Sequence, residues 1–533
     1  MTTKPKVLIS DSLSPAAVAI FKERGVHVDV KKGLKPEELC AIIGDYDGLA
    51  IRSATKVTKD VLAAATRLKV VGRAGIGVDN VDIPAATARG VLVMNTPFGN
   101  SITTAEHTIA LMFALARQIP AANASTQAGK WEKSKFMGTE LYCKTLGTIG
   151  CGNIGSIVAD RALGLKMKVI AYDPFLSAER AAQLGVDKVE FDELLARADI
   201  ITLHTPLTDA TRNILNAKAF AKCKKGVRII NCARGGLVNE ADLKAAMESG
   251  QVAGAAMDVF TTEPAKECVL FGMENVICTP HLGASTSEAQ ENVALQVAEQ
   301  ISDYLTRGII TNALNTPSVS AEEAALLKPY MRLTEVLGSY CAQIVDDTVK
   351  DIAVDFEGDA SKLNVKPLVT LAVAHVLGPL MAAVNAVNAL TVAKDRGIQV
   401  SEMKRETSAK YRTLMRMTVR TNKSTYVIEG ALIGGTPRIV SLGDFAIEGE
   451  PSPHMLYLRN NDKPGVIGRF STMLGDNKVN IANFNMGRNA PGDKNLSLVA
   501  VDQPVDDKLL AKIQALDGVL KVRRVNFAAT KTK

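Results

Sequence analysis

The sequence predicts an α/β fold in which two lobes, each built on a doubly wound parallel sheet, precede two smaller units. Short apolar runs alternate with helical patterns in the first hundred residues, at 6–10, 47–51, 69–73 and 91–95, and a second alternating series runs from 145 to about 280. Strands that alternate with helices form parallel sheets covered by helices on both faces. After residue 317 the pattern becomes mixed α/β, and residues 454–527 read strand, helix, two strands, helix, strand. With 533 residues, the chain is also too long for one hydrophobic core.

Three joints rich in Pro, Gly or Asn place the boundaries: NTPFGN at 95–100, NTP at 315–317 and PSP at 451–453. A helix is expected to open after the first joint, with Thr103 and Glu106 spaced as a capping box, and another near 285 returns to the first lobe. We therefore expect a first lobe made of residues 1–97 and 285–316 and a second lobe made of 98–284, with a cleft between them. A third unit spans 317–450 and a fourth spans 453–533.

The composition excludes several classes of protein. The formal charge of +7 is small for this length, and the basic clusters are short and lack aromatic neighbours, which argues against nucleic-acid binding. Eight scattered cysteines with no C-x-x-C pair argue against a zinc ribbon or a disulfide scaffold. The sequence opens directly on a strand pattern without a signal peptide, so we expect a cytoplasmic protein with no bound metal.

One uncharged segment, residues 367–393, is long enough to suggest a membrane span. It is interrupted by Gly378-Pro379 and contains His375, Asn385 and Asn388, which would be costly in lipid. We expect two buried helices that meet at the Gly-Pro pair, and no membrane association.

The second lobe has a dinucleotide-binding pattern. A strand ends in the motif Gly150-x-Gly152-x-x-Gly155, a helix follows, and the next strand, KVIAY, ends at Asp173. The first glycine makes the turn, the second lets the backbone approach a pyrophosphate, and the third packs helix on strand. Because a carboxylate at Asp173 can accept hydrogen bonds from an adenosine ribose and would repel a 2′-phosphate, the pattern favours NAD over NADP.

Three later segments end strands of the same lobe, at the edge where open α/β sheets bind ligands. They bring Arg234 (in VRIINCARGG), Asp258 with Glu263 (in AAMDVFTTEP) and His281 (in VICTPHLGAST). An Arg can hold the carboxylate of a 2-oxo acid, a His can take or give the hydroxyl proton, and a nearby Glu can orient the imidazole. Of the other five histidines, His204 follows an apolar strand, and the remaining four have no comparable neighbours in the sequence.

The segments GTIGCGNIG, NCARGGLV, DVFTTEP and TPHLGAST resemble the D-isomer-specific 2-hydroxyacid dehydrogenases, and with AIRSATKVT, VGRAGIGVDN, NTPFGNS and GKWEKSKFMGTEL the resemblance covers essentially all of 1–315. It implies a flavodoxin-like substrate lobe, a Rossmann lobe that binds NAD, and Arg234, Glu263 and His281 as the catalytic residues. Besides the three glycines, Asp173 and Asp258, it implies cofactor contacts from Ile76, Asn153, Ile154, Thr205, Cys232, Ala233, Gly283 and Ala284. Two positions depart from many relatives: Asn153 stands where they have Arg, and Ile76 where some have Thr.

The expected substrate follows from two arginines at strand ends of the first lobe, Arg52 and Arg73. A phosphorylated substrate needs such cations, whereas lactate or glycerate does not. With the resemblance, the substrate implied is 3-phosphoglycerate, oxidised in the first step of L-serine synthesis. Ser53 and Gly75 are implied as further substrate contacts, and Lys133 as a contact supplied by a partner subunit.

The two units beyond residue 317 resemble the intervening regulatory domain of the longer members of the family and an ACT domain, the small amino-acid-sensing module. We expect L-serine to bind in the second of these. Asp462, at a Pro-Gly helix start, would meet the ammonium group, and Asn480, in the strand expected beside it, would meet the carboxylate. The resemblance implies a homo-oligomer, in particular a tetramer.

Two alternatives stay open at this point. One is a related reductase of hydroxypyruvate or glyoxylate, against which the long tail counts. The other is a binding protein that senses NAD, like the corepressors that share this pair of lobes but lack an ACT tail.

Overall fold

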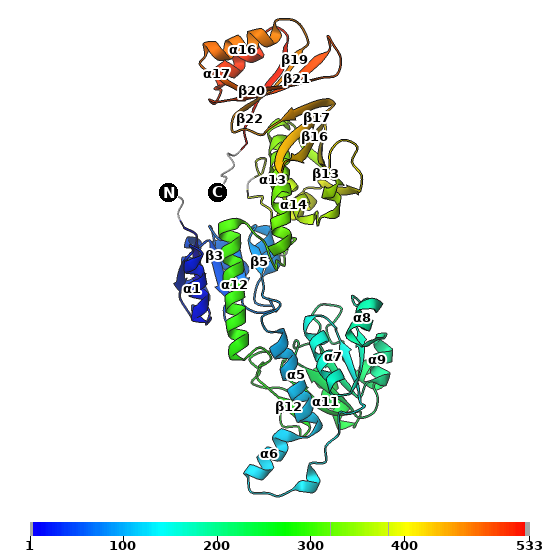
Figure 1. Cartoon of the computed structure of the whole chain (residues 1–533). Helices are drawn as coiled ribbons and strands as arrows, with labels where there is room; N and C mark the ends of the chain where they lie inside the picture. Colours follow the sequence, from blue (N-terminus) through cyan, green and yellow to red (C-terminus); the bar gives the residue numbers. More distant parts are fainter. Residues whose placement is uncertain (1–3, 320, 382, 528–533) are drawn as a thin grey trace.

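The computed structural model describes residues 4–319, 321–381 and 383–527. Four units follow one another along the molecule, each with its own sheet, from the second lobe at one end to the C-terminal unit at the other (Figure 1). The predicted fold class is confirmed, with two lobes on parallel sheets followed by a mixed-sheet unit and an α+β unit.

The first lobe is a five-stranded parallel sheet in the order β2-β1-β3-β4-β5. Its strands are β1 (Lys6–Ile9), β2 (His27–Val30), β3 (Gly48–Ile51), β4 (Val70–Arg73) and β5 (Leu92–Met94). Its early helices are α1 (Pro15–Glu23), α2 (Pro36–Ile42), α3 (Lys59–Ala64) and α4 (Ile83–Ala88), and a short 3-10 turn spans Ile43–Asp45. Apolar side chains cover both faces of the sheet, as a doubly wound sheet requires.

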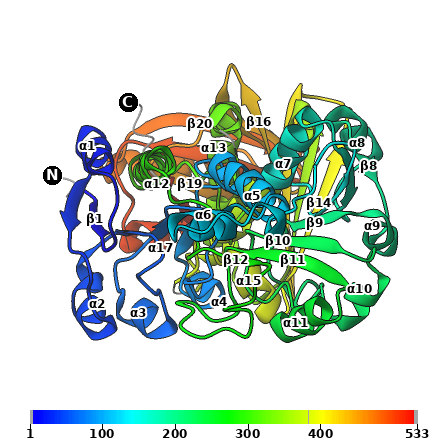
Figure 2. The ribbon, with the colours of Figure 1, turned by 90° about the horizontal axis from the view of Figure 1, so that it is seen from below.

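The second lobe is a seven-stranded parallel sheet in the order β12-β11-β10-β9-β6-β7-β8. Its strands are β6 (Thr145–Ile149), β7 (Lys168–Tyr172), β8 (Asp187–Lys188), β9 (Ile200–Leu203), β10 (Val227–Asn231), β11 (Val252–Met257) and β12 (Val276–Cys278). Its helices are α5 (Ser101–Ala116), α6 (Ile119–Gln127), α7 (Asn153–Gly164), α8 (Ala178–Leu184), α9 (Phe191–Arg197), α10 (Ala217–Lys222) and α11 (Glu240–Glu248). In Figure 2, α5 and α7 lie on one side of this sheet and α10 and α11 on the other. The strand order reverses between β6 and β9, and the ligand site of such sheets lies at this point.

Two segments connect the lobes. The chain passes from β5 into α5, which packs in the core of the second lobe, and it returns through α12 (Ser287–Arg307), which packs on the first-lobe sheet. The predicted capping box is wrong: Asn100 is the N-cap of α5, and Thr103 lies inside the helix. At the return, Thr286 caps α12 by accepting a hydrogen bond from the Ala289 N–H.

The third unit has a six-stranded sheet, β14-β13-β15-β16-β17-β18. Its strands are β13 (Val349–Gly358), β14 (Gln399–Arg405), β15 (Thr413–Thr421), β16 (Thr425–Ile433), β17 (Thr436–Leu442) and β18 (Phe445–Gly449), and its helices are α13 (Ala321–Ile344), α14 (Lys366–Leu377) and α15 (Ala389–Asp395), with a 3-10 turn at Asp359–Lys362. The uncharged segment forms α14 and the start of α15. The two helices do not meet at Gly378-Pro379, because turns separate them.

No helix among the described residues combines the length and the apolar character needed to cross a membrane.

The C-terminal unit has the predicted order of elements: β19 (Met455–Asn461), α16 (Val466–Asp476), β20 (Ile481–Arg488), β21 (Lys494–Val501), α17 (Asp507–Gln514) and β22 (Val519–Val525). Its antiparallel sheet has the order β20-β21-β19-β22. Both helices pack on one face of this sheet, and residues of the other face, such as Leu496 and Leu498, join the core of the third unit. The two tail units therefore share a continuous apolar core.

Candidate active site

The predicted site residues gather where strands of both lobes end. Arg52 follows β3 and Arg73 ends β4 in the first lobe, while Arg234, Asp258 and Thr279 follow β10, β11 and β12 in the second. These are all carboxyl ends of parallel strands, so each lobe presents the same edge of its sheet to the cleft.

The glycine motif has the geometry that a dinucleotide needs. Gly150 has a φ of +93°, and a Cβ there would lie 2.5 Å from the His204 carbonyl oxygen. A Cβ on Gly155 would lie 2.3 Å from the Gly150 carbonyl oxygen, so this glycine lets α7 pack closely on the turn. A Cβ on Gly152, by contrast, would meet no atom within 4 Å. The space before the N-terminus of α7 is therefore open for a pyrophosphate.

Asp173 lies beside this motif. Its Oδ2 accepts a hydrogen bond from the Cys151 N–H at 2.8 Å, and its Oδ1 accepts one from the Phe175 N–H at 2.8 Å. The carboxylate is thus held against the glycine turn at the end of β7, where a ribose hydroxyl can reach it.

His281 and Glu263 form a direct pair. The imidazole Nδ1 lies 2.7 Å from Glu263 Oε2, and Glu263 Oε1 accepts a hydrogen bond from the Phe260 N–H. Burial alone would raise the pKa of Glu263, but these hydrogen bonds from His281 and Phe260 hold that pKa below its ordinary value. An ionised carboxylate only accepts, so the proton lies on Nδ1, and Nε2 of the neutral ring can accept a proton from a hydroxyl.

Asp258 fixes the segment that contains His281. Its side chain is fully buried; Oδ1 accepts hydrogen bonds from the Leu282 N–H at 2.7 Å and from Thr279 Oγ1 at 2.5 Å, and Oδ2 accepts one from the Gly283 N–H at 2.8 Å. The Asp258 carbonyl oxygen also accepts the His281 N–H at 2.9 Å. His281 itself has a φ of +55°, a left-handed conformation that a non-glycine residue adopts at a cost.

Arg234 reaches across the cleft. Its Nε donates to Asp79 Oδ2 of the first lobe at 3.1 Å, and a Cβ on Gly77 would lie only 1.7 Å from its Nη2. Gly77 thus leaves room for the guanidinium beside the first lobe. A substrate carboxylate can replace the exposed Asp79 as the partner of Arg234.

Arg73 lies close to the positive charges of Arg234 and Arg52. Burial lowers the pKa of its guanidinium to about 10, and the neighbouring charges of Arg234 and Arg52 contribute in the same direction. Its Nε is buried and has no hydrogen-bond partner among the described residues. A Cβ on Gly75 would lie 1.8 Å from Arg73 Nη1, so Gly75 makes space for this side chain. Three guanidinium groups near one another favour a substrate with more than one negative charge.

A cavity of about 570 Å³ adjoins the Glu263–His281 pair. Ser53 contributes from the first lobe, and Phe260, Phe271, Cys278 and Pro280 supply much of the remaining wall. The largely apolar wall of this cavity can exclude water from the Glu263–His281 pair.

The remaining predicted cofactor residues lie at the expected edge with different exposure. Asn153 is exposed at the start of α7, Cys232 and Gly283 are buried, and the others are half-buried: Ile76, Ile154, Thr205, Ala233 and Ala284. Lys133 lies on an exposed segment after α6, which projects from the far end of the second lobe (Figure 1). The substrate contact from Lys133 stays a prediction, because it requires a partner subunit.

The predicted effector pair is not brought together within the chain. Asp462 follows β19 at the end that pairs with Lys494, whereas Asn480 precedes β20 at the opposite end of the sheet, where its Nδ2 donates to Asp502. The two oxygens of Asp462 already accept hydrogen bonds from Arg488, Gly492 and Asn495. Expecting the two residues side by side was wrong, because β20 pairs with β21 and not with β19.

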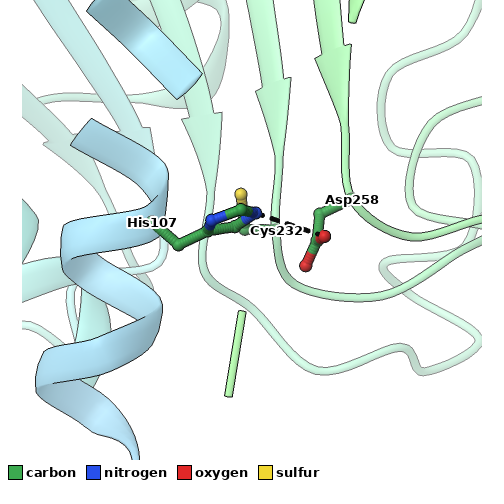
Figure 3. A group of neighbouring side chains, drawn as sticks. All are labelled: His107, Cys232 and Asp258. Carbon is green, nitrogen blue, oxygen red and sulfur yellow. Dashed lines mark hydrogen bonds and ion pairs between the residues drawn. The ribbon is translucent and has the colours of Figure 1, made fainter. Parts of the chain in front are cut away.

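His107 is a residue of this site that was not predicted from the sequence. Its imidazole lies beside Asp258 and Cys232, which are 151 and 125 positions further along the chain (Figure 3). No local sequence pattern around His107 predicts its contact with Asp258, because α5 reaches the ends of β10 and β11 only through the tertiary fold.

Comparison with known proteins decides the family. Residues 109–283 match the model for the NAD-binding domain of D-isomer-specific 2-hydroxyacid dehydrogenases, residues 326–443 match the D-3-phosphoglycerate dehydrogenase intervening domain, and residues 454–518 match the ACT domain. The D-3-phosphoglycerate dehydrogenase of Synechocystis is 44% identical over 97% of this chain and 94% of its own, and that of Bacillus subtilis is 41% identical over 98% and 99%. The chain belongs to the D-3-phosphoglycerate dehydrogenase family. It is an NAD-dependent dehydrogenase that acts on a 2-hydroxy acid.

Solved structures resemble the two lobes. A protein from Thermus thermophilus, TT0316, has a TM-score of 0.54 and 32% identity, covering 58% of this chain and 99% of its own. A glyoxylate reductase from Paecilomyes thermophila has a TM-score of 0.55 and 30% identity, covering 59% of this chain and 99% of its own. The two-lobed part thus corresponds to whole proteins elsewhere, to which this enzyme adds its intervening and ACT domains.

Proposed function

We propose that this enzyme oxidises D-3-phosphoglycerate to 3-phosphohydroxypyruvate with NAD, the first step of L-serine synthesis by the phosphorylated route. The observation that carries the proposal is the grouping of Arg52, Arg73 and Arg234 around a cleft that also contains the His281–Glu263 pair. A carboxylate and a phosphate on one small substrate need such a set of cations. The names of the full-length relatives agree with it.

Each side chain then has a role. Arg234 binds the substrate carboxylate and orients the C2 group, while Arg73 and Arg52 bind the phosphate, helped by Ser53 and, from a partner subunit, Lys133. His281 Nε2 takes the proton of the C2 hydroxyl, and Glu263 stabilises the imidazolium that results. The glycine turn and Asp173 would hold NAD, which would supply the hydride acceptor for the oxidation at C2. The test is a comparison of kcat/KM for phosphohydroxypyruvate, hydroxypyruvate and glyoxylate with NADH.

Cofactor choice gives one testable result. The wild-type enzyme should prefer NAD to NADP, and Asp173→Ala should narrow that preference, because the carboxylate that repels a 2′-phosphate is gone. The measurement is kcat/KM for both cofactors, with Asp160→Asn on the exposed side of α7 as a control. Equal efficiency with both cofactors in the wild type would refute this role of Asp173.

We also propose that the enzyme works as a homo-oligomer, in particular a tetramer. The segment around α6 exposes large apolar side chains, with Trp131 87% and Met137 79% exposed, and Ile119 and Tyr142 are exposed nearby. An apolar patch of this kind favours burial against another subunit, and it lies beside Lys133.

We also propose a cytoplasmic location, with which the eight free cysteines agree.

L-serine is the effector we propose for the ACT domain. Because Asp462 and Asn480 lie at opposite ends of one sheet, a site that used both would have to form between two chains. Serine should inhibit the intact enzyme, and a chain ending at Thr316 should keep turnover and lose the inhibition, since two-lobed relatives fold without this tail. A serine titration of both versions tests this. Inhibition that survives truncation, or none in the intact enzyme, would refute the assignment.

A further inference from the structure

His107, a histidine outside the proposed catalytic set, contacts residues that hold the segment containing His281. His107 Nε2, on the inter-lobe helix α5, is 3.2 Å from Asp258 Oδ1 and 3.4 Å from Thr279 Oγ1 (Figure 3 shows the first contact). The third member of the group, Cys232, follows β10, and the ligand atoms of His107, Cys232 and Asp258 all lie within 4.8 Å of one another.

The chemistry of this group favours a hydrogen-bonded network over a metal centre. Asp258 already accepts hydrogen bonds from His107, Thr279 and the N–H groups of Leu282 and Gly283, which together use both of its oxygens. A cation would have to displace at least one of these donors from a buried carboxylate. Burial also raises the pKa of the Cys232 thiol to about 12, so this neighbouring side chain stays a neutral thiol and a poor metal ligand.

Each of these donors matters because Asp258 is fully buried. Burial alone would raise the pKa of its carboxyl, and the hydrogen bonds, with that from His107 foremost, hold the pKa below its ordinary value. An ionised carboxylate away from water depends on the donors around it. Through its side chain and its carbonyl, this one residue holds three consecutive N–H groups, those of His281, Leu282 and Gly283.

We propose that His107 is a positioning residue for His281: by donating its Nε2–H to Asp258, it keeps that carboxylate ionised and oriented, and Asp258 in turn holds the left-handed backbone at His281. The inference rests on the proposed role of His281 in proton transfer. It makes α5, which follows the joint between the lobes, part of the support of the catalytic base.

Two variants of His107 test the proposal. His107→Leu removes the donor, whereas His107→Gln retains an amide N–H at about the same reach from the backbone. We expect the Leu variant to lower kcat by between about 10- and 100-fold, the scale on which misplacement of a reacting group acts, with the KM of the hydroxy acid changed less than threefold. The Gln variant should recover most of the lost kcat. Glu106→Gln, an exposed neighbour on the same helix, is the matched control.

Amide hydrogen exchange gives a readout that does not depend on the substrate. The Leu282 and Gly283 amides should exchange faster in His107→Leu and at the wild-type rate in His107→Gln and Glu106→Gln. Normal exchange and normal kcat in His107→Leu would overturn the proposal, as would equal impairment of the Leu and Gln variants. Loss of wild-type activity on chelation, restored by Zn²⁺, would replace the network by a metal site. Failure of the proposed substrate would appear instead as an inactive wild type with unchanged exchange results.

Discussion

Replacing His281 with alanine is expected to lower kcat by roughly 10²–10⁴-fold, the usual effect of losing a positioned acid–base group. The imidazole is the group in the cleft whose proton position is set by a carboxylate, through the 2.7 Å contact with Glu263. Substrate binding should change little, because the arginines that hold the anions remain. The measurement is steady-state turnover in both directions, with His27→Ala, an exposed histidine on β2, as the control.

The variant Glu263→Gln tests the role of the carboxylate separately from that of the His281 imidazole. In Glu263→Gln the amide no longer stabilises a charged imidazole, so the limb of the pH–rate profile that reports imidazole protonation should move toward acid. Near-normal turnover of His281→Ala would mean that another group moves the proton.

Replacing Arg234 with alanine should lower kcat/KM by about 30- to 150-fold, mainly through a higher KM. Truncating one partner of a buried, hydrogen-bonded charge pair costs roughly 2–5 kcal/mol. Arg234 is only partly buried, so we expect the lower part of that range, about 2–3 kcal/mol, which corresponds to the stated loss of kcat/KM. Arg234→Lys should recover only part of the loss, because an ammonium group cannot make the two parallel hydrogen bonds of a guanidinium. Unchanged KM in Arg234→Ala would place the carboxylate elsewhere.

The sequence predicted the features that depend on neighbouring residues. The glycine motif, Asp173 at the end of β7, and the strand ends before Arg234 and His281 all follow from short patterns, and parallel sheets place such ends on one edge. The order of elements in the C-terminal unit follows from the same kind of pattern. Strand β2 was missed, because it is a short edge strand, HVDV, in which valines alternate with polar residues and no apolar run forms.

Features that depend on distant segments could not be predicted in this way. His107 meets Asp258 only because α5 crosses the ends of β10 and β11, and Arg234 meets Asp79 only across the cleft. The prediction that Asp462 and Asn480 lie side by side was wrong for the same reason. A strand that follows a helix was expected beside the first strand, but β21 lies between β19 and β20 in the sheet. Strand order is a property of the whole unit and not of the residues at either position.

We expect the guanidinium groups of Arg52 and Arg73 to select a phosphorylated 2-hydroxy acid, while Arg234 binds the carboxylate that every such acid carries. The most direct test is the ratio of kcat/KM for phosphohydroxypyruvate to that for hydroxypyruvate, measured with NADH on the intact wild-type enzyme. A phosphate held by a guanidinium pair contributes roughly 2 kcal/mol or more, so we expect a ratio of at least about 30 in favour of the phosphorylated substrate. A ratio near one, or a preference for hydroxypyruvate or glyoxylate, would contradict the claim and assign the enzyme to the reductases of unphosphorylated 2-oxo acids.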